Sequence, residues 1–176
     1  DLLYNGGIGT YVKASCESPL DANDRTNDAV RIDASELRAR VVGEGGNLGF
    51  TQRARIEYAL AGGLIYTDAI DNSAGVGTSD HEVNIKILTS SLLAAGDMTR
   101  KQRDTLLAQM TDDIARRVLI DNYQQTQAVS LEATAGCELL NAHAQLMRWL
   151  EAHGGLNRAV EFLPDEKHLI ERRQMN

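Results

Sequence analysis

Glycine is distributed very unevenly along this chain, and this feature constrains the possible fold more than any other. Eleven of the 15 glycines lie before residue 78, in clusters at positions 6–9, 43–49, 62–63 and 75–77. Glycine clusters between short apolar runs are typical of tight turns between strands and helices. After residue 78 glycine is sparse, and apolar residues recur with helical spacing. We therefore expect two parts, residues 1–78 and residues 79–176.

The first part has the pattern of an α/β fold. Residues 1–4 and 37–42 are predicted as strands, the second because its apolar and charged residues alternate before it becomes fully apolar. The glycine loop at 43–49 follows, and then come a helix over 51–60 and a strand over 64–70. The order strand, glycine loop, helix, strand is one βαβ unit of a parallel sheet. Residues 71–75 are predicted as a turn.

The second part is predicted to be almost entirely helical. Ser79 and Glu82 have the spacing of a capping box, so a helix is expected to begin at Ser79 and to end near Gly96. Thr99 and Gln102 form a second capping box, which begins a helical region that runs to about residue 135. Two more helices are expected, over 137–153 and 165–174. The whole chain should therefore be rich in helix.

Composition and charge exclude several kinds of partner. The net charge of −7 is spread over both parts, and no basic stripe is present, which argues against nucleic acid. No apolar run approaches the roughly 20 residues that a membrane span needs. The two cysteines have no metal-ligand spacing, so we expect no metal site and a reducing cytoplasm. The sequence begins Asp1-Leu2-Leu3-Tyr4, without methionine, and we expect it to be part of a longer protein.

Two loops are candidates for ligand binding, and each has a plainer interpretation. The loop at 43–49 fits GxGxxxG, though not GxGxxG, so it can hold a phosphate or ribose or serve only as a tight βα turn. The segment 70–82 leaves a strand, passes small residues and enters a helix at Ser79. The Ser79 hydroxyl either caps that helix, worth about 1 kcal/mol, or joins the helix N-terminus in receiving an anionic group.

Other catalytic motifs are missing. No tyrosine has a lysine four residues on, as a short-chain dehydrogenase requires, and no GxxxxGK[ST] phosphate loop is present. His81 and Glu82 lack the second histidine of a zinc helix, and residues 77–81 lack the final glycine of a nucleophile elbow.

Two ordered motifs resemble the glutamate dehydrogenase superfamily. Residues 44–47 read Glu-Gly-Gly-Asn, similar to that family's Glu-Gly-Ala-Asn. Residues 72–79 read Asn-Ser-Ala-Gly-Val-Gly-Thr-Ser, with Glu82 three residues on, similar to Asn-Ala-Gly-Gly-Val-x-x-Ser-x-x-Glu. Residues 1–12, 71–86, 110–113 and 121–123 look closer still to the large, multidomain bacterial NAD-specific glutamate dehydrogenases. The resemblance covers essentially the whole chain.

The resemblance implies a fold, a reaction and a set of site residues. It implies the later half of a Rossmann-like, dinucleotide-binding domain over residues 1–78, with a helical segment over residues 79–176 packed on it. The family converts L-glutamate to 2-oxoglutarate and ammonium and transfers hydride to NAD. By matched position, the resemblance places Gly45, Gly46, Asn47 and Asn72 beside NAD, and Asn72, Val76 and Ser79 beside the substrate.

The resemblance also implies what these residues do not contain. The family's catalytic lysine and aspartate lie upstream of the matched motifs, and Lys13 and Lys86 do not sit in matching positions. No catalytic residue is therefore expected in this chain, and the 176 residues are expected to be inactive without the remainder of the parent chain. The parent is expected to form a homo-oligomer.

Two other interpretations are compatible with the sequence. The chain could be a non-catalytic helical interaction or regulatory module that has kept a degenerate Rossmann half. It could also belong to another amino-acid dehydrogenase, such as a leucine type, because that class uses the same asparagine and serine.

Overall fold

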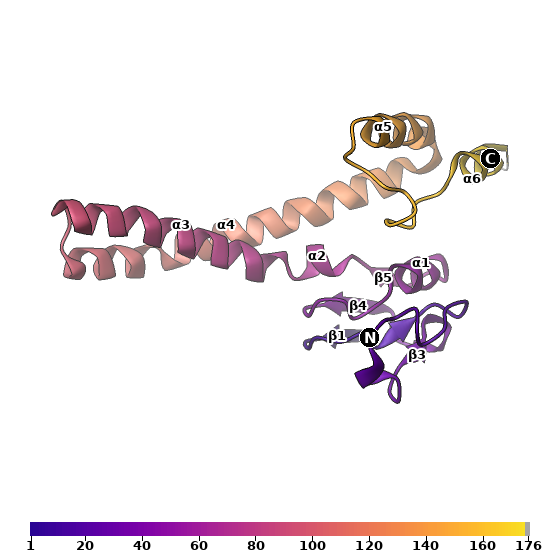
Figure 1. Cartoon of the computed structure of the whole chain (residues 1–176), viewed down its shortest axis with the longest axis horizontal. Coiled ribbons are helices and arrows are strands. Elements are labelled where there is room, and N and C mark those ends of the chain that lie inside the picture. The colour runs from indigo at the N-terminus through magenta and orange to yellow at the C-terminus, as the bar shows by residue number, and fades with distance from the viewer. Residues whose placement is uncertain (175–176) are drawn as a thin grey trace.

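The structure, a computed structural model, describes residues 1–174 and combines a small parallel sheet with long helices (Figure 1). The strands are β1 (Leu2–Asn5), β2 (Val12–Lys13), β3 (Ile32–Asp33), β4 (Val41–Glu44) and β5 (Leu64–Ile65). The helices are α1 (Gln52–Leu60), α2 (Asp68–Asp71), α3 (Ser73–Ala95), α4 (Arg100–Ala135), α5 (Leu140–Ala152) and α6 (Glu166–Gln174). Short 3-10 helices cover Arg25–Asn27, Ala34–Glu36 and Gly136–Leu139. The predicted helix-rich α/β class is confirmed.

The main sheet has three parallel strands in the order β1-β4-β5. Leu2 to Asn5 pair with Val41 to Glu44, and Val41 and Val42 also pair with Leu64 and Ile65. The strands β4 and β5 with the intervening α1 form the predicted βαβ unit. The strands β2 and β3 form a separate two-stranded parallel sheet.

Helix α1 contributes Ala54 and Tyr58 to a small core. The helix predicted over 51–60 begins at Gln52, and Thr51 is its N-cap, since its Oγ1 accepts a hydrogen bond of 3.1 Å from the Ala54 N–H. Ala54 and Tyr58 face inward, and the Tyr58 hydroxyl donates a 2.6 Å hydrogen bond to the carbonyl of Ala39. The buried side chains of this core are those of Val12, Ala34, Val42, Phe50, Ala54 and Tyr58.

A buried ion pair fastens α1 to the end of β4. Glu44 is fully buried, and its Oε1 and Oε2 accept hydrogen bonds of 2.6 and 3.0 Å from Nε and Nη2 of Arg55. Glu44 Oε2 also accepts a bond of 3.2 Å from the Phe50 N–H. Burial raises the pKa of the Glu44 carboxyl above its ordinary value, although its hydrogen bonds to Arg55 oppose the shift. Burial alone would lower the pKa of Arg55, but the bonds and charge of Glu44 raise it.

The sequence predictions for residues 64–79 are wrong in three respects. The strand over 64–70 ends at Ile65, because the chain turns into α2, where the N–H groups of Ile70 and Asp71 bond to the Thr67 carbonyl. The turn expected over 71–75 is helical, apart from Asn72. Helix α3 begins at Ser73, six residues before Ser79, which therefore caps nothing. Gly, Ser and Thr have low helix propensity, but packing against a neighbouring helix overrides propensity here.

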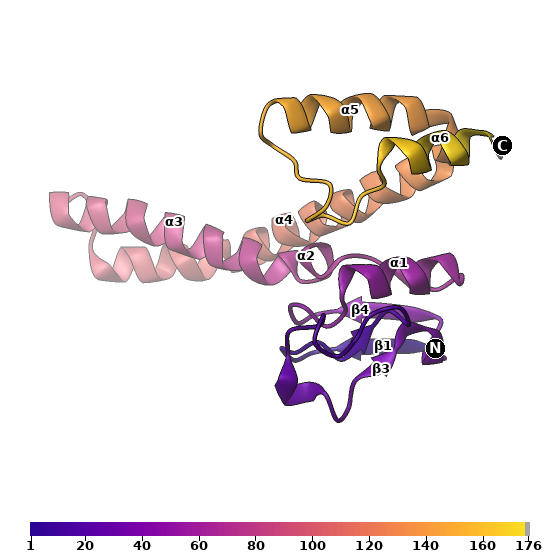
Figure 2. The same cartoon turned by 45° about the vertical axis from the view of Figure 1, so that its right-hand side comes forward.

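Helices α3 and α4 form a long hairpin that extends beyond the sheet (Figures 1 and 2). Gly96 ends α3 in the left-handed conformation (φ 79°), which glycine adopts without strain. The Thr99–Gln102 capping box is confirmed at the start of α4. With 36 residues, α4 is about 54 Å long. The expected division of the chain after residue 78 lies within the continuous helix α3.

The C-terminal helices pack beside the end of α4 (Figure 2). Residues 136–139 form a 3-10 helix, so the helix predicted over 137–153 becomes α5 only at Leu140. Arg158 joins α5 to α6, with ion pairs of 3.0 Å to Glu151 and 3.3 Å to Glu166. Among residues 1–174, no helix is long and apolar enough to cross a membrane.

Replacing Glu44 with glutamine should destabilise the sheet region strongly. The substitution leaves the buried Arg55 charge without its main partner, so the free energy of unfolding should fall by about 3 kcal/mol. Urea unfolding followed by circular dichroism measures the change. The matched control is Glu82→Gln, which breaks the exposed Glu82–Lys86 pair on α3 and should cost about 0.5 kcal/mol or less. Equal losses for the two variants would contradict a stabilising role of the buried pair.

Candidate functional site

The residues singled out by sequence gather at the carboxyl edge of the parallel sheet. Strands β1, β4 and β5 run in the same direction, so the segments that follow them meet at one edge. Open parallel sheets bind ligands at this edge. The segment after β4 is the glycine loop, and the segment after β5 leads through α2 to Asn72.

The two predicted glycines of the loop lie against the end of β1. The Gly46 N–H donates a 2.8 Å hydrogen bond to the Asn5 carbonyl. A β-carbon on Gly46 would overlap the Gly7 backbone, with the carbonyl carbon 2.7 Å away. A β-carbon on Gly45 would overlap the ring of Tyr4. Gly46 therefore requires glycine, because the obstacle is backbone, whereas at Gly45 the neighbouring side chain of Tyr4 is exposed and can move.

Helix α2 holds this loop from the other side with two aspartates. Asp68 Oδ2 accepts a 2.8 Å hydrogen bond from the Leu48 N–H, and Asp68 Oδ1 lies 3.2 Å from Nη2 of Arg55. Asp71 Oδ2 accepts a 2.7 Å hydrogen bond from the Glu44 N–H. Leu48 has a positive φ of 60°, which is unusual for a residue with a side chain, so the loop is held in a strained conformation.

Asn47 and Asn72 come together at the centre of the edge. The Asn72 amide Nδ2 donates a hydrogen bond to the Asn47 amide oxygen Oδ1. Asn47 is exposed and Asn72 is half-buried. The structure thus joins two residues that are 25 positions apart and that the sequence assigned to different motifs.

Val76 and Ser79 lie beyond Asn72, within α3. They are three residues apart, and such spacing places their side chains on the same face of the helix. Both are exposed, Val76 to 60%. Of the four predicted contact residues, the structure brings Asn47 and Asn72 into contact and places Val76 and Ser79 further along α3.

The chemistry expected of Ser79 needs correction. The sequence suggested that the hydroxyl and a helix N-terminus receive an anion together. The structure places the N-terminus of α3 at Ser73, with Asn72 as N-cap, and the effect of a helix dipole falls off within the first turn. Ser79 can therefore offer an anion only its hydroxyl.

Sequence reasoning missed the two aspartates that position the loop. Asp68 lay within a predicted strand and Asp71 within a predicted turn. The available signal was Asp68 itself, because a charged residue inside an apolar run argues against a buried strand. A carboxylate that follows a parallel strand lies where it can bond to backbone N–H groups of the neighbouring loop.

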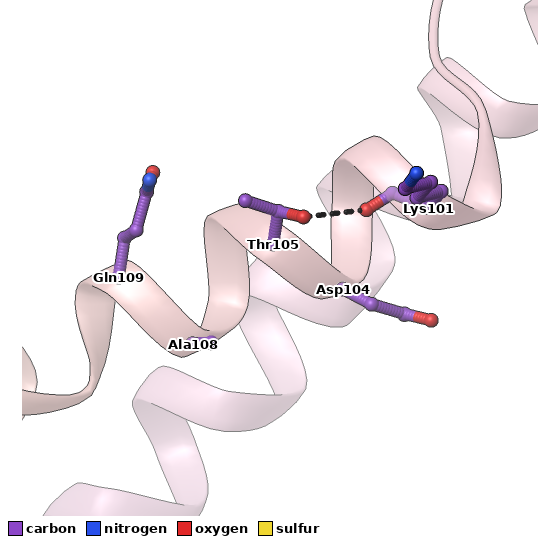
Figure 3. A pocket seen from close by; sticks show the side chains of 5 residues that line it. All are labelled: Lys101, Asp104, Thr105, Ala108 and Gln109. Carbon is purple, nitrogen blue, oxygen red and sulfur yellow. Dashed lines mark hydrogen bonds between the residues drawn. The ribbon is translucent and has the colours of Figure 1, made fainter.

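Two hollows elsewhere in the structure are lined by few or none of the residues at this edge of the sheet. One lies on the first turns of α4, lined by Lys101, Asp104, Thr105, Ala108 and Gln109 (Figure 3). Its side chains point apart, and the dashed bond in Figure 3 joins the Thr105 hydroxyl to the Lys101 carbonyl of the same helix. It offers no convergent polar groups, so the edge of the sheet remains the better candidate.

The other hollow, of about 660 Å³, lies between the start of α1 and the loop that contains residues 15–30. It touches the glycine loop only at Leu48. Within the described part of the chain, no three His, Cys, Asp or Glu side chains lie close enough to hold a metal ion.

Comparison with known proteins identifies relatives over nearly the whole chain. The family profile described as the catalytic domain of bacterial NAD-glutamate dehydrogenase matches residues 1–132. The NAD-specific glutamate dehydrogenase of Pseudomonas aeruginosa is 57% identical over 172 residues, which is 98% of this chain. Those of Halomonas elongata and Mycobacterium tuberculosis are each 52% identical, over 100% and 98% of the chain. The chain spans only 11% of the length of each relative.

Replacing Gly46 with alanine should displace the glycine loop. The added methyl group meets backbone atoms of Gly7, which cannot rotate away, so we expect a loss of about 1–3 kcal/mol in the free energy of unfolding. The matched control is Gly75→Ala, where a β-carbon meets nothing within 4 Å and should stabilise α3 by about 0.5–1 kcal/mol. Urea unfolding compares the two. A neutral Gly46→Ala would show that the loop is not tightly packed on β1.

Proposed function

The chain belongs to the bacterial NAD-glutamate dehydrogenase family, and from this premise we propose that it is the part of a catalytic domain that joins the NAD and glutamate sites. The parent would oxidise L-glutamate to 2-oxoglutarate and ammonium and reduce NAD. The observation that carries the proposal is the contact between Asn47 and Asn72 at the carboxyl edge of the sheet. It supports the proposal because it joins the motif that would bind the cofactor to the motif that would bind the substrate.

The residues at this edge fit a dinucleotide. The Gly45-Gly46 backbone lies close against the end of β1, and the neighbouring Asn47 amide is exposed. Amide groups can both donate to and accept from ribose hydroxyls and a carboxamide. When bound, NAD would accept the hydride from the α-carbon of glutamate. The half-buried Asn72, fixed by Asn47, would orient the ligands on both sides of that transfer.

The residues proposed to contact the substrate lie on α3. Val76 would contact the aliphatic part of glutamate, and the Ser79 hydroxyl would donate a hydrogen bond to a carboxylate. Positioning of this kind accounts for large rate effects, because a misplacement of about 1 Å can cost roughly 100-fold in rate. The residues around Asn72 would thus position the cofactor and the substrate, while proton transfer requires groups from elsewhere in the parent chain.

Two lysines of this chain are unsuited to act as the proton-transfer group at this site. Lys13 is paired with Asp33 in the smaller sheet, and Lys86 is paired with Glu82 two turns beyond Ser79. We therefore propose that the catalytic lysine and aspartate lie in the remainder of the parent. A Rossmann-like sheet completed by that remainder, a homo-oligomeric parent and a cytoplasmic location belong to the same proposal.

Removing Asn72 or Ser79 should impair glutamate oxidation by the parent protein. With Asn72→Ala or Ser79→Ala, we expect kcat/KM for glutamate to fall about tenfold or more, which corresponds to about 1.4 kcal/mol in the transition state. The rate of NADH formation, followed by absorbance, measures the change. The matched control is Ser91→Ala, an exposed serine on the same helix whose hydroxyl bonds to the Ile87 carbonyl.

The outcomes separate the candidate functions. An active parent whose Asn72 and Ser79 variants equal the Ser91 control would keep the reaction but reject the assigned site. An inactive but folded parent would favour the non-catalytic interaction module. Activity on leucine in place of glutamate would favour another amino-acid dehydrogenase.

The 176 residues alone should not catalyse the reaction. They would hold ligands without the proton-transfer groups, so no glutamate-dependent NADH formation above the uncatalysed rate is expected. The same absorbance assay tests this with equal molar amounts of the chain and the parent. Turnover by the isolated chain would mean that its own residues supply the proton transfer.

A further inference from the structure

One face of α4 runs along the segment that carries Asn72. Val118 and Asn122 are four residues apart, which places them on the same side of the helix, and Ser130 also contacts this segment. The buried Val118 faces Gly77 of α3, where a β-carbon would lie 3.8 Å from its methyl groups. The Ser130 hydroxyl lies 2.9 Å from the Tyr66 hydroxyl, just after β5. Asn122 lies between these two contacts.

Asn122 bonds to both sides of Asn72. Its amide Nδ2 donates a 2.7 Å hydrogen bond to the Ile70 carbonyl in α2 and a 3.0 Å hydrogen bond to Ser73 Oγ, at the start of α3. An amide nitrogen carries two hydrogens, so both donors are used. The side chain is half-buried, which protects the bonds from exchange with water.

The backbone at Asn72 needs such support. Asn72 has φ −103° and ψ 5°, outside the helical region, so α2 and α3 do not form one continuous helix. Helix α2 has only four residues, too few to be stable by itself. On the side of the sheet, Asp68 and Asp71 fix α2 to the glycine loop. On the opposite side, the bonds from Asn122 fix the break.

We propose that Asn122 is a positioning residue for the dehydrogenase reaction, acting through Asn72. It holds the two ends of the helix break so that the Asn72 amide meets the Asn47 amide at the sheet edge. The two hydrogen bonds of the Asn122 amide go to Ile70 and Ser73, and neither goes to Asn47, Asn72, Val76 or Ser79. The expected effect on catalysis rests on the proposed function. The claim that Asn122 holds Asn72 in place does not depend on that function.

The test replaces Asn122 with aspartate in the parent protein. Aspartate has the same shape but no hydrogens to donate, and its charge repels the Ile70 carbonyl. We expect kcat/KM for glutamate to fall about tenfold, with the melting temperature within a few degrees of the wild type. Asn122→Ala, which adds no charge, should lower kcat/KM in the same direction but less. The matched control is Asn84→Asp on α3, whose exposed amide bonds only to the Asp80 carbonyl of its own helix.

A double-variant cycle distinguishes positioning from general support. If Asn122 acts through Asn72, the Asn72→Ala/Asn122→Asp variant should be no less active than Asn72→Ala alone. Fully additive losses would overturn the proposal, as would a loss that only follows the fraction of folded protein. Asn122 variants with wild-type activity would also overturn it.

A structure of the Asn122→Asp parent tests the geometric part without any assay. The proposal requires that the hydrogen bond between Asn72 and Asn47 is lost, and an unchanged bond would overturn it. This result does not depend on whether the parent oxidises glutamate. A parent without that activity would reject the proposed function, while the displacement of Asn72 would still decide the role of Asn122.

Discussion

The buried contact between Glu44 and Arg55 is the interaction on which the rest of the structure depends. It joins the end of a strand to the helix that follows, across a loop that has almost no apolar side chains to hold it. A charge in this position is costly to bury unless it is paired and hydrogen-bonded, and here both conditions are met. Arg55 also reaches Asp68, so the same guanidinium draws α2 toward the loop. The site at the sheet edge is thus built around an ion-pair network.

This network explains why an exposed edge can be well defined. The glycine loop is held against β1 by the Gly46 bond to Asn5 and against α2 by the bonds to Asp68 and Asp71. Each of these three bonds is donated by a backbone N–H group, so they add to the hold that the Glu44 side chain has on the loop. The Asn47 side chain takes no part in holding the loop and accepts the hydrogen bond from Asn72. Rigid support of this kind is what a site needs when it contributes orientation to a reaction.

The long helices support the same site from the other side. Helix α4 packs along residues 66–77 and contributes Asn122 at the break between α2 and α3. The hairpin beyond this region is thin, and several large apolar side chains on it are exposed, among them Val83, Ile87 and Leu88. The half of α4 near the sheet therefore stabilises the site, while the far half extends away from it (Figure 2).

Local patterns in the sequence determined much of this protein. The βαβ unit, the Thr51 cap, the Gly96 helix end and the Thr99 capping box follow from short-range rules, because they depend on neighbouring residues. Sequence motifs also singled out Asn47 and Asn72 before any geometry was known. What only the tertiary structure decided is where α3 begins and what holds the loop. The start of α3 at Ser73 reflects packing against α4, and the roles of Asp68, Asp71 and Asn122 depend on partners 20 to 52 residues away. Such contacts leave no local signature, because they arise only when distant segments pack together.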